Sequence, residues 1–517
     1  MSARSERLRV ARRTPPVALR RRLDNLGLRV QARLDAEWAD RVLPWAIAAV
    51  LFVVLTAMAL AVVRQLDGGP GLGVWGQAAW NVRRGAPPVS SLAGGDPVVR
   101  QWSFVALPVL EATRWIPAPQ ALAGAQALAL ALAVVPIWRL ARESVSLRIG
   151  TTTAVVMAYA LAPTVHAANL SLFHPEALAV PGLAWATLFG RRKRWPAYWL
   201  CVALVLLCRA DLGVTVAALG LLGVLEGDRR HGWITAGVGM AWTVAALVIL
   251  DPRLPTGPLT AAQAFAAEGV APLAELRTLF TDPVRGLGDL FSQPSLPVLV
   301  ALFAPLLFLP LTATRYMIPA LPPLVLGIAG DQAVQRLVDA GDVRGWLGTS
   351  QVVVATVPVF VAAIVALGRI GRRSITRVNL DHRLVGALVL AAAVIFVQNA
   401  PSSPYQQPWA WGSRDDTDQA RLDAIDAVPD RAGVTVSPQL AALVAERRVV
   451  HDTWIGPPER AGSLRPTTRA VVLDTTATDG NGSELWDAGD RAAVRAALRR
   501  QGYAVVFERD GILALTR

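Results

Sequence analysis

"PWAIAAVLFVVLTAMALAVVR", residues 44–64, contains no charged side chain before Arg64. A helix of about 20 apolar residues is long enough to cross the hydrocarbon core of a bilayer. The chain has 517 residues, of which 53% are hydrophobic and 17% are charged, and similar apolar runs follow the first one along its length. This pattern predicts a polytopic α-helical membrane protein.

We expect about eleven membrane spans, of which the pair 196–208 and 211–226 could also be one long kinked helix. Several spans are short, so they would tilt little or lie in a thinned part of the bilayer. The predicted spans are 44–64, 119–140, 149–165, 176–190, 196–208, 211–226, 233–250, 295–312, 316–329, 348–368 and 384–398.

Two long loops, residues 66–118 and 251–294, separate predicted spans on one side of the membrane. The stretch "DPVVRQWSFVALPVLEATRWIP" in the first loop is half apolar and is expected to lie along the membrane interface as a helix. Irregular backbone near a membrane survives where it is buried in protein or lines a wet cavity. A cavity is therefore expected on this side.

The distribution of arginine predicts the orientation. Residues 1–43 contain eleven Arg and five acidic residues, and the loops 191–195, 227–232 and 369–383 are also rich in Arg. Such clusters mark the cytoplasmic side, so residues 1–43 are expected inside and residues 399–517 outside. The formal net charge of +13 then reflects topology, and we expect no nucleic-acid partner. All 51 basic residues except Lys193 are Arg, which suggests a GC-rich, actinobacterial genome.

Residues 399–517 are predicted to form a small extracytoplasmic α/β domain, because strand and helix patterns alternate there. This region contains no Gly-rich phosphate loop and no paired carboxylates, so we interpret it as a binding or stabilising module. The predicted strands are 432–438, 447–452, 469–474 and a hairpin over 503–517 that turns at Asp510-Gly511, and the predicted helices are 418–428, 439–446 and 490–502.

Ionisable residues at span ends are costly and tend to mark function. The segment "LSLFHPEALAVP" places His174 and Glu176 at the outer end of a predicted span, and "LCRADLG" places Arg209 and Asp211 at another. The structural alternatives are a helix start at Pro175-Glu176 and an ion pair at a helix break. If these residues serve a function, they line the outer cavity together.

The chain resembles the membrane protein family catalogued as domain of unknown function 2079, which is itself similar to C-fold (GT-C-like) glycosyltransferases. The segments that carry the resemblance are "GLGVWGQAAW", "LSLFHPEALAVPGLAWA", "LLCRADLG" and "RYMIPALPPLVLG". The resemblance implies a GT-C-like helical domain over 44–398 and sugar transfer from a polyprenyl-phosphate carrier at the outer face of the membrane. It also implies that Gln77, Trp80 and Gln101 belong to the substrate site.

The chain departs from the family pattern at Gly71, at Gln101, where a histidine is usual, and at Arg209-Ala210-Asp211, where Lys-Glu-Asp is usual. The first loop usually reads Asp-Leu-Gly, and Gly71 stands where that acid would activate an acceptor. Glycine cannot act as a base. Asp67 or Asp96 would have to replace it as the catalytic residue.

Two hypotheses follow. In the first, the protein is a glycosyltransferase in which Arg209 holds the donor phosphate, and His174 and Glu176 position the acceptor or a divalent cation such as Mg²⁺ or Mn²⁺. In the second, the site is degenerate, and the protein binds a lipid or glycan or scaffolds an envelope partner. A transporter is disfavoured, since the sequence shows no inverted repeat.

Overall fold

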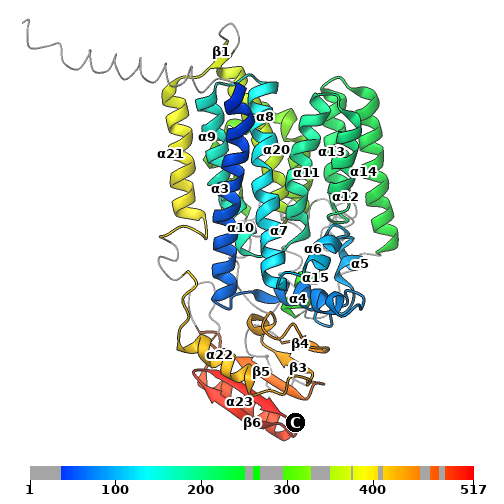
Figure 1. Cartoon of the computed structure of the whole chain (residues 1–517), viewed down its shortest axis with the longest axis vertical. Helices are drawn as coiled ribbons and strands as arrows, with labels where there is room; N and C mark the ends of the chain where they lie inside the picture. The colour runs from blue at the N-terminus through cyan, green and yellow to red at the C-terminus, as the bar shows by residue number, and fades with distance from the viewer. Residues whose placement is uncertain are drawn as a thin grey trace, which may run out of the picture.

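The computed structural model describes residues 37–250, 260–267, 284, 295–327, 350–373, 377–405, 411–453, 466–476 and 484–517. Its helices stand side by side as a bundle, with the C-terminal domain against one end and the hairpin of β1 (Arg372–Arg373) and β2 (Val378–Asn379) at the other (Figure 1). We call these the domain end and the Arg-rich end. The segment 1–36 and most of loop 251–294 lie outside the described residues.

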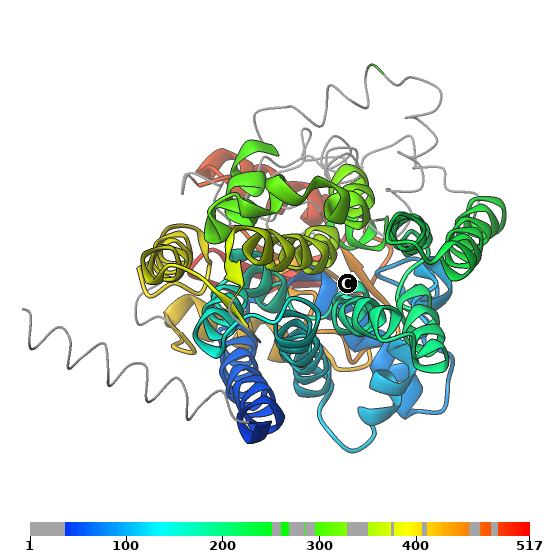
Figure 2. The ribbon, with the colours of Figure 1, turned by 90° about the horizontal axis from the view of Figure 1, so that it is seen from above.

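Six helices in the described part of the chain are long and apolar enough to cross a membrane. α20 (Ser350–Ile370) runs through the middle of the bundle and is largely buried, whereas α14 and α21 lie at its edge and are largely exposed (Figure 2). The six are α3 (Glu37–Arg64), α7 to η1 (Ala118–Ser144), α9 with α10 (Ile149–Leu170), α14 (Arg229–Ile249), α20 and α21 (His382–Asn399).

The eleven predicted spans are not confirmed. The other predicted spans correspond to shorter or broken helices, which are α11 (Ala179–Arg191), α12 (Trp195–Leu206), α13 (Leu212–Leu225) and a pair, Val298–Leu306 with Leu309–Gly327, bent by 117°. Trp195 at the start of α12 and Glu226 just after α13 line the same pocket at the Arg-rich end. The chain therefore turns back between these helices, and they are not one kinked helix.

α13 and α14 pack with almost no space between their backbones. A Cβ atom added to Gly220 would lie 2.3 Å from the backbone N of Ala236, and one added to Gly239 would lie 2.4 Å from the backbone N of Ala217. Gly213 and Gly232 meet the facing helix equally closely. Small residues allow helices to approach in this way, and dispersion between the backbones then holds the pair together.

The first long loop folds into helices at the domain end. It forms α4 (Gly69–Arg83), α5 (Pro97–Gln101) and α6 (Ala106–Ala112), so residues 96–117 form two short helices where we expected one. Part of the second loop forms α15 (Ala261–Ala267), which lies against α4 and α5.

The C-terminal domain is built on a five-stranded sheet in the order β4-β3-β5-β7-β6, with β3 parallel to both of its neighbours and β5, β7 and β6 antiparallel. The hairpin turns at Asp510-Gly511, as predicted, and both residues have positive φ. The elements are α22 (Asp416–Asp426), β3 (Val434–Val436), β4 (Val450–Asp452), β5 (Ala470–Asp474), α23 (Ala488–Arg500), β6 (Ala504–Arg509) and β7 (Ile512–Thr516).

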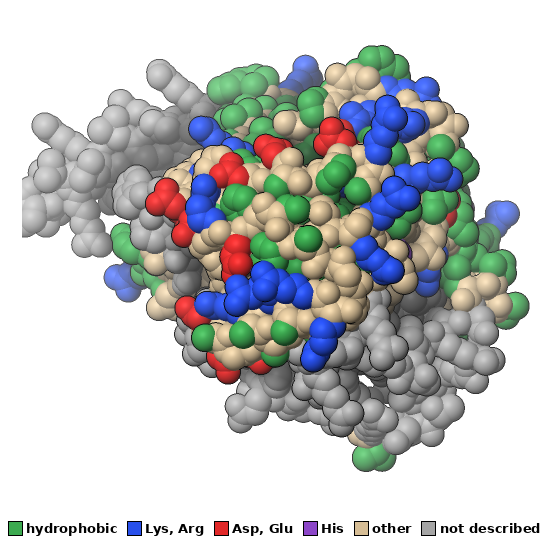
Figure 3. All heavy atoms as spheres, turned by 90° about the horizontal axis from the view of Figure 1, so that it is seen from below, with side chains coloured by type: hydrophobic (Ala, Val, Ile, Leu, Met, Phe, Trp, Pro, Cys, Tyr) green, Lys and Arg blue, Asp and Glu red, His purple; other side chains and the backbone are tan. Residues whose placement is uncertain are grey.

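The face of this domain that points away from the bundle carries both signs of charge between apolar side chains (Figure 3). Ion pairs within this domain include Arg495–Glu508 and Arg509–Asp423, both at 2.8 Å. A surface of mixed sign lacks the single-sign field that attracts a polyanion.

The predicted helix 439–446 is wrong. Only Pro438–Leu440 is helical, as the 3-10 helix η6, and turns follow it. These turns press on the glycines of α4, where a Cβ atom on Gly73 would lie 2.9 Å from the backbone C of Ala441. Leu72 and Trp75 of α4 belong to the same hydrophobic cluster as Leu440 and Val444. Tertiary packing against α4 thus overrides local helix propensity.

Candidate functional site

Three of the predicted polar residues form a buried ion triad at the domain end. Arg209 donates from Nε to Asp211 Oδ1 at 2.6 Å and from Nη2 to Asp211 Oδ2 at 3.1 Å. Its Nη1 lies 2.9 Å from Glu176 Oε1. The exposed fractions of the side chains are 2% for Arg209, 1% for Glu176 and 3% for Asp211. The triad holds one positive and two negative formal charges, so its net charge is −1.

Two turns bring the triad together. Glu176 lies in the 3-10 helix η2 (Pro175–Leu178), which leads directly into α11, as the Pro-Glu pair predicted. Arg209 and Asp211 lie in the turn between α12 and α13. The backbone N–H of Ala210 in this turn donates to the carbonyl of Gln101 at 3.0 Å. The predicted substrate residue Gln101 therefore ties the first loop to the triad through its backbone.

His174 lies beside the triad, close enough for the charges of Glu176 and Arg209 to act on its imidazole. Its backbone N–H donates to Gln126 Oε1 of α7 at 2.6 Å. Its ring meets the ring of Phe265 edge-on, with centroids 5.2 Å apart. His174 is 9% exposed, so α15 covers the side that we expected to face an open cavity.

α15 is positioned from both sides. On one side, a Cβ atom on Gly71 would lie 2.8 Å from Cε2 of Phe265, so the ring fills the space next to this glycine. On the other, Asp452 at the end of β4 accepts from Thr260 Oγ1 at 2.5 Å and from the backbone N–H of Ala262 at 2.7 Å. Burial raises the pKa of Asp452 to about 6. The C-terminal domain thus holds the N-terminus of α15.

The two candidate bases lie at the same end of the bundle. Asp67 is exposed, and the charges of Arg421 and Asp418 in α22 act on it. Asp96 is half-buried and caps α5, where Oδ1 accepts from the backbone N–H of Val98 at 2.8 Å.

Gln77 and Trp80 extend from α4. The amide of Gln77 is buried and bonded within the protein, with Nε2 donating to the carbonyl of Arg447 at 2.9 Å and Oε1 accepting from Ser90 Oγ at 2.9 Å. Trp80 is half-exposed, and the guanidinium of Arg84 lies 4.6 Å from its ring centroid.

No group of three or more His, Cys, Asp and Glu side chains suited to a metal ion is found within the described part of the chain. Sequence reasoning missed Phe265, Asp452 and Gln126. The only sequence signal for Gln126 is an amide in an apolar run. Asp452 looks like an ordinary strand end, and its role follows only from contact with a distant loop.

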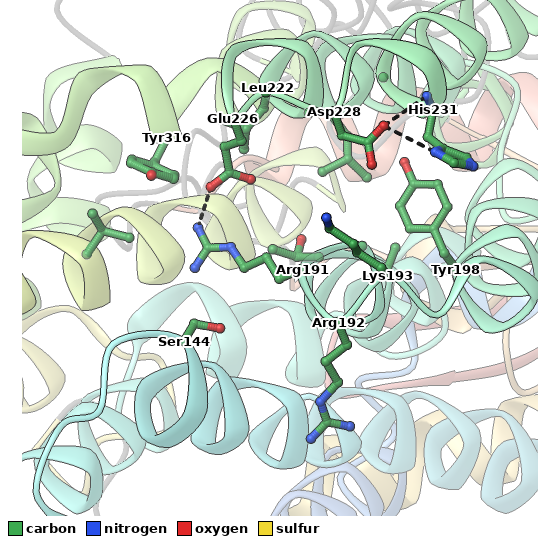
Figure 4. Close-up of a pocket in the computed structure, with 18 of the residues that line it drawn as sticks. Ser144, Arg191, Arg192, Lys193, Tyr198, Leu222, Glu226, Asp228, His231 and Tyr316 are labelled. Carbon is green, nitrogen blue, oxygen red and sulfur yellow. Dashed lines mark hydrogen bonds and ion pairs between the residues drawn. The ribbon is translucent and has the colours of Figure 1, made fainter. Parts of the chain in front are cut away.

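A pocket lies at the opposite, Arg-rich end of the bundle, with a volume of about 1100 Å³. Its walls are the turns and helix ends of α11 to α14, together with Tyr316 and the end of α20 (Figure 4). From the Arg-rich loops we predicted only the orientation in the membrane and not a pocket.

Among curated proteins, none matches the chain. A family model described as "Predicted membrane protein (DUF2079)" matches residues 66–514, which include α4, the triad and nearly all of the C-terminal domain. Because this match covers most of the chain, the protein belongs to the DUF2079 family of membrane proteins.

Proposed function

We propose that this protein binds a lipid-linked glycan at the domain end and does not transfer its sugar. The observation that carries the proposal is the state of Arg209, whose buried guanidinium is hydrogen-bonded to Asp211 and ion-paired with Glu176. A donor phosphate at Arg209 would have to share the guanidinium with two buried carboxylates, whose negative charges repel it. A triad of net charge −1 suits hydroxyl groups better than an anion.

The surroundings of Gly71 support the same proposal. A C-fold glycosyltransferase would be expected to carry a base at this position, and here the ring of Phe265 occupies the adjacent space. An aspartate at position 71 would have to displace Phe265. We infer that this chain retains the fold of a sugar-handling site without the usual base.

The test uses the full-length protein in nanodiscs and polyprenyl-phosphate glucose with a photoreactive group on the sugar. We expect crosslinking near His174 without release of glucose. His174→Asn should fold and insert normally and reduce crosslinking about five-fold, which corresponds to the loss of one hydrogen bond of about 1 kcal/mol. His382→Asn is the matched control, since His382 is 85% exposed at the other end. Equal crosslinking of both variants would refute binding at this site.

Sugar transfer is a second candidate, favoured by one observation: Asp67 is exposed at the domain end, and Asp96 is only half-buried. In that case wild-type protein would release glucose to an acceptor. Asp67→Asn or Asp96→Asn would abolish the release, and the Asp96 variant would keep its helix cap, because Asn caps as well as Asp. Release that survives in both variants would exclude these carboxylates as the base.

We also propose that the chain crosses the membrane eleven times, with its N-terminus in the cytoplasm and residues 399–517 outside. The Arg-rich end supports this orientation by the positive-inside rule. A reporter fused to the C-terminus that is active only outside the cytoplasm should give signal. Activity of a cytoplasm-only reporter there would reverse the assignment.

A further inference from the structure

The Arg-rich pocket contains more positive than negative charge. Its lining includes four cationic side chains, Arg191, Arg192, Lys193 and Arg369, and three acids, Glu143, Glu226 and Asp228. Each acid already has a partner. Glu226 pairs with Arg191 at 2.9 Å, Glu143 pairs with Arg192, and Asp228 lies 3.1 Å from His231 Nδ1.

Two cations remain without a carboxylate among the described residues, namely Lys193 and Arg369. Lys193 extends toward the pocket between Arg191 and Tyr198 (Figure 4). Arg369 donates to the carbonyl of Thr312 at 3.2 Å, and its guanidinium lies 5.8 Å from the ring centroid of Tyr316. The buried Nε–H of Arg191 also lacks an acceptor within the described structure. The pocket thus offers donors and positive charge to an anion.

The backbone of Lys193 indicates that its position matters. Lys193 is the only lysine of the chain, and its φ is +54° in the turn that closes α11. Its N–H donates to the carbonyl of Gly190 at 3.0 Å, as in a helix C-terminal cap, where glycine is the usual residue. A lysine is strained in this conformation, and such strain is often found at functional positions.

Part of the remaining lining is apolar and is contributed by neighbouring helices. Leu219 and Leu222 of α13 and Val365 of α20 form part of the wall. A free phosphate gains nothing from contact with these apolar side chains. A phospholipid has both a charged headgroup and acyl chains whose first carbons can contact them. Basic pockets between membrane helices on the cytoplasmic side bind anionic lipid headgroups.

We propose that the pocket at the Arg-rich end binds the phosphate headgroup of an anionic phospholipid, with Lys193 and Arg369 as its main contacts. The site is separate from the domain end, and the proposal does not depend on sugar binding there.

The experiment measures binding of dioctanoyl phosphatidylglycerol to the full-length protein in detergent, against dioctanoyl phosphatidylcholine and glycerol phosphate. We expect phosphatidylglycerol to bind at least ten-fold more tightly than either. Lys193→Gly and Arg369→Gln should each weaken this binding about five-fold, which is the effect of about 1 kcal/mol per basic residue. Glycine relieves the left-handed backbone, so the first variant should remain folded.

Arg230→Gln is the matched control, because Arg230 is exposed at the same end and does not line the pocket. It should leave binding unchanged. An equal loss in this variant would show a diffuse charge effect and overturn the proposal. Equal affinity for phosphatidylcholine would overturn it too, and equal affinity for glycerol phosphate would replace the lipid with a soluble phosphate compound.

Discussion

Arginine side chains have different environments at the two ends of the bundle. At the domain end, Arg209 is buried between Glu176 and Asp211. At the Arg-rich end, Arg191 pairs with Glu226 at the wall of a pocket, and their side chains are 17% and 28% exposed. The difference teaches that a conspicuous polar motif in an apolar sequence is not by itself an open site. The charges of the triad at the domain end pair with one another. At the Arg-rich end, Lys193 and Arg369 have no carboxylate partner among the described residues.

The largest effect should come from removing the central cation at the domain end. Arg209→Met leaves two buried carboxylates without a partner, which typically costs about 3–5 kcal/mol. We expect a sharp drop in the yield of monodisperse protein. Arg191→Met at the other end should cost about 1 kcal/mol or less, since its pair with Glu226 is partly exposed and screened by water. Similar yields of Arg209→Met and Arg191→Met would show that the two arginines contribute equally to stability.

A pH series tests how the C-terminal domain holds α15. The pKa of Asp452 is raised by burial to about 6, so the folded state binds a proton that the unfolded state has lost between about pH 4 and 6. Stability is therefore expected to fall as pH rises through this window, by up to about 3 kcal/mol. Asp452→Asn should remove this dependence. Thermal unfolding of both proteins at pH 4.5 and 7 measures this pH dependence of stability. If the variant loses as much stability as the wild type between these pH values, Asp452 is not the source of the dependence.

The contact between α4 and the C-terminal domain predicts a somewhat smaller effect. Gly73→Leu would push against the backbone of Ala441, and overpacking of this kind costs about 1–3 kcal/mol. Faster proteolytic release of the C-terminal domain should report the change. Gly124→Leu is the control, because a Cβ atom on Gly124 of α7 meets nothing within 4 Å. Equal release from both variants would place the domain contact elsewhere.

The smallest effect on stability, but an informative one, is expected from Glu226→Gln. This variant leaves Arg191 without its carboxylate partner and makes the pocket more positive. Stability should change by less than about 1 kcal/mol. Affinity for phosphatidylglycerol should rise about five-fold, as for one added basic charge. Weaker binding would mean that Glu226 itself contacts the lipid.

Sequence alone predicted the helical membrane class and the strands of the C-terminal domain, because hydropathy and period-two patterns are local properties. It also singled out Glu176, Arg209 and Asp211, because charges in apolar runs stand out. An ion pair of Arg209 with Asp211 was one of the alternatives that the sequence left open, and the structure contains it. The sequence did not predict that Glu176 joins this pair, since that contact depends on two turns about thirty residues apart. The glycines of α4 carried the family resemblance, yet their contact with Ala441 and its neighbours depends on packing across more than three hundred residues.

The close packing of α13 on α14 restricts which mutations the gene can tolerate. A single-base change that replaces a glycine by another residue introduces alanine, valine, serine, cysteine, tryptophan, arginine, aspartate or glutamate. At Gly213, Gly220, Gly232 and Gly239, even the single carbon of alanine would lie less than 3 Å from the facing backbone. In a library of random variants, few substitutions at these four positions should therefore yield folded protein.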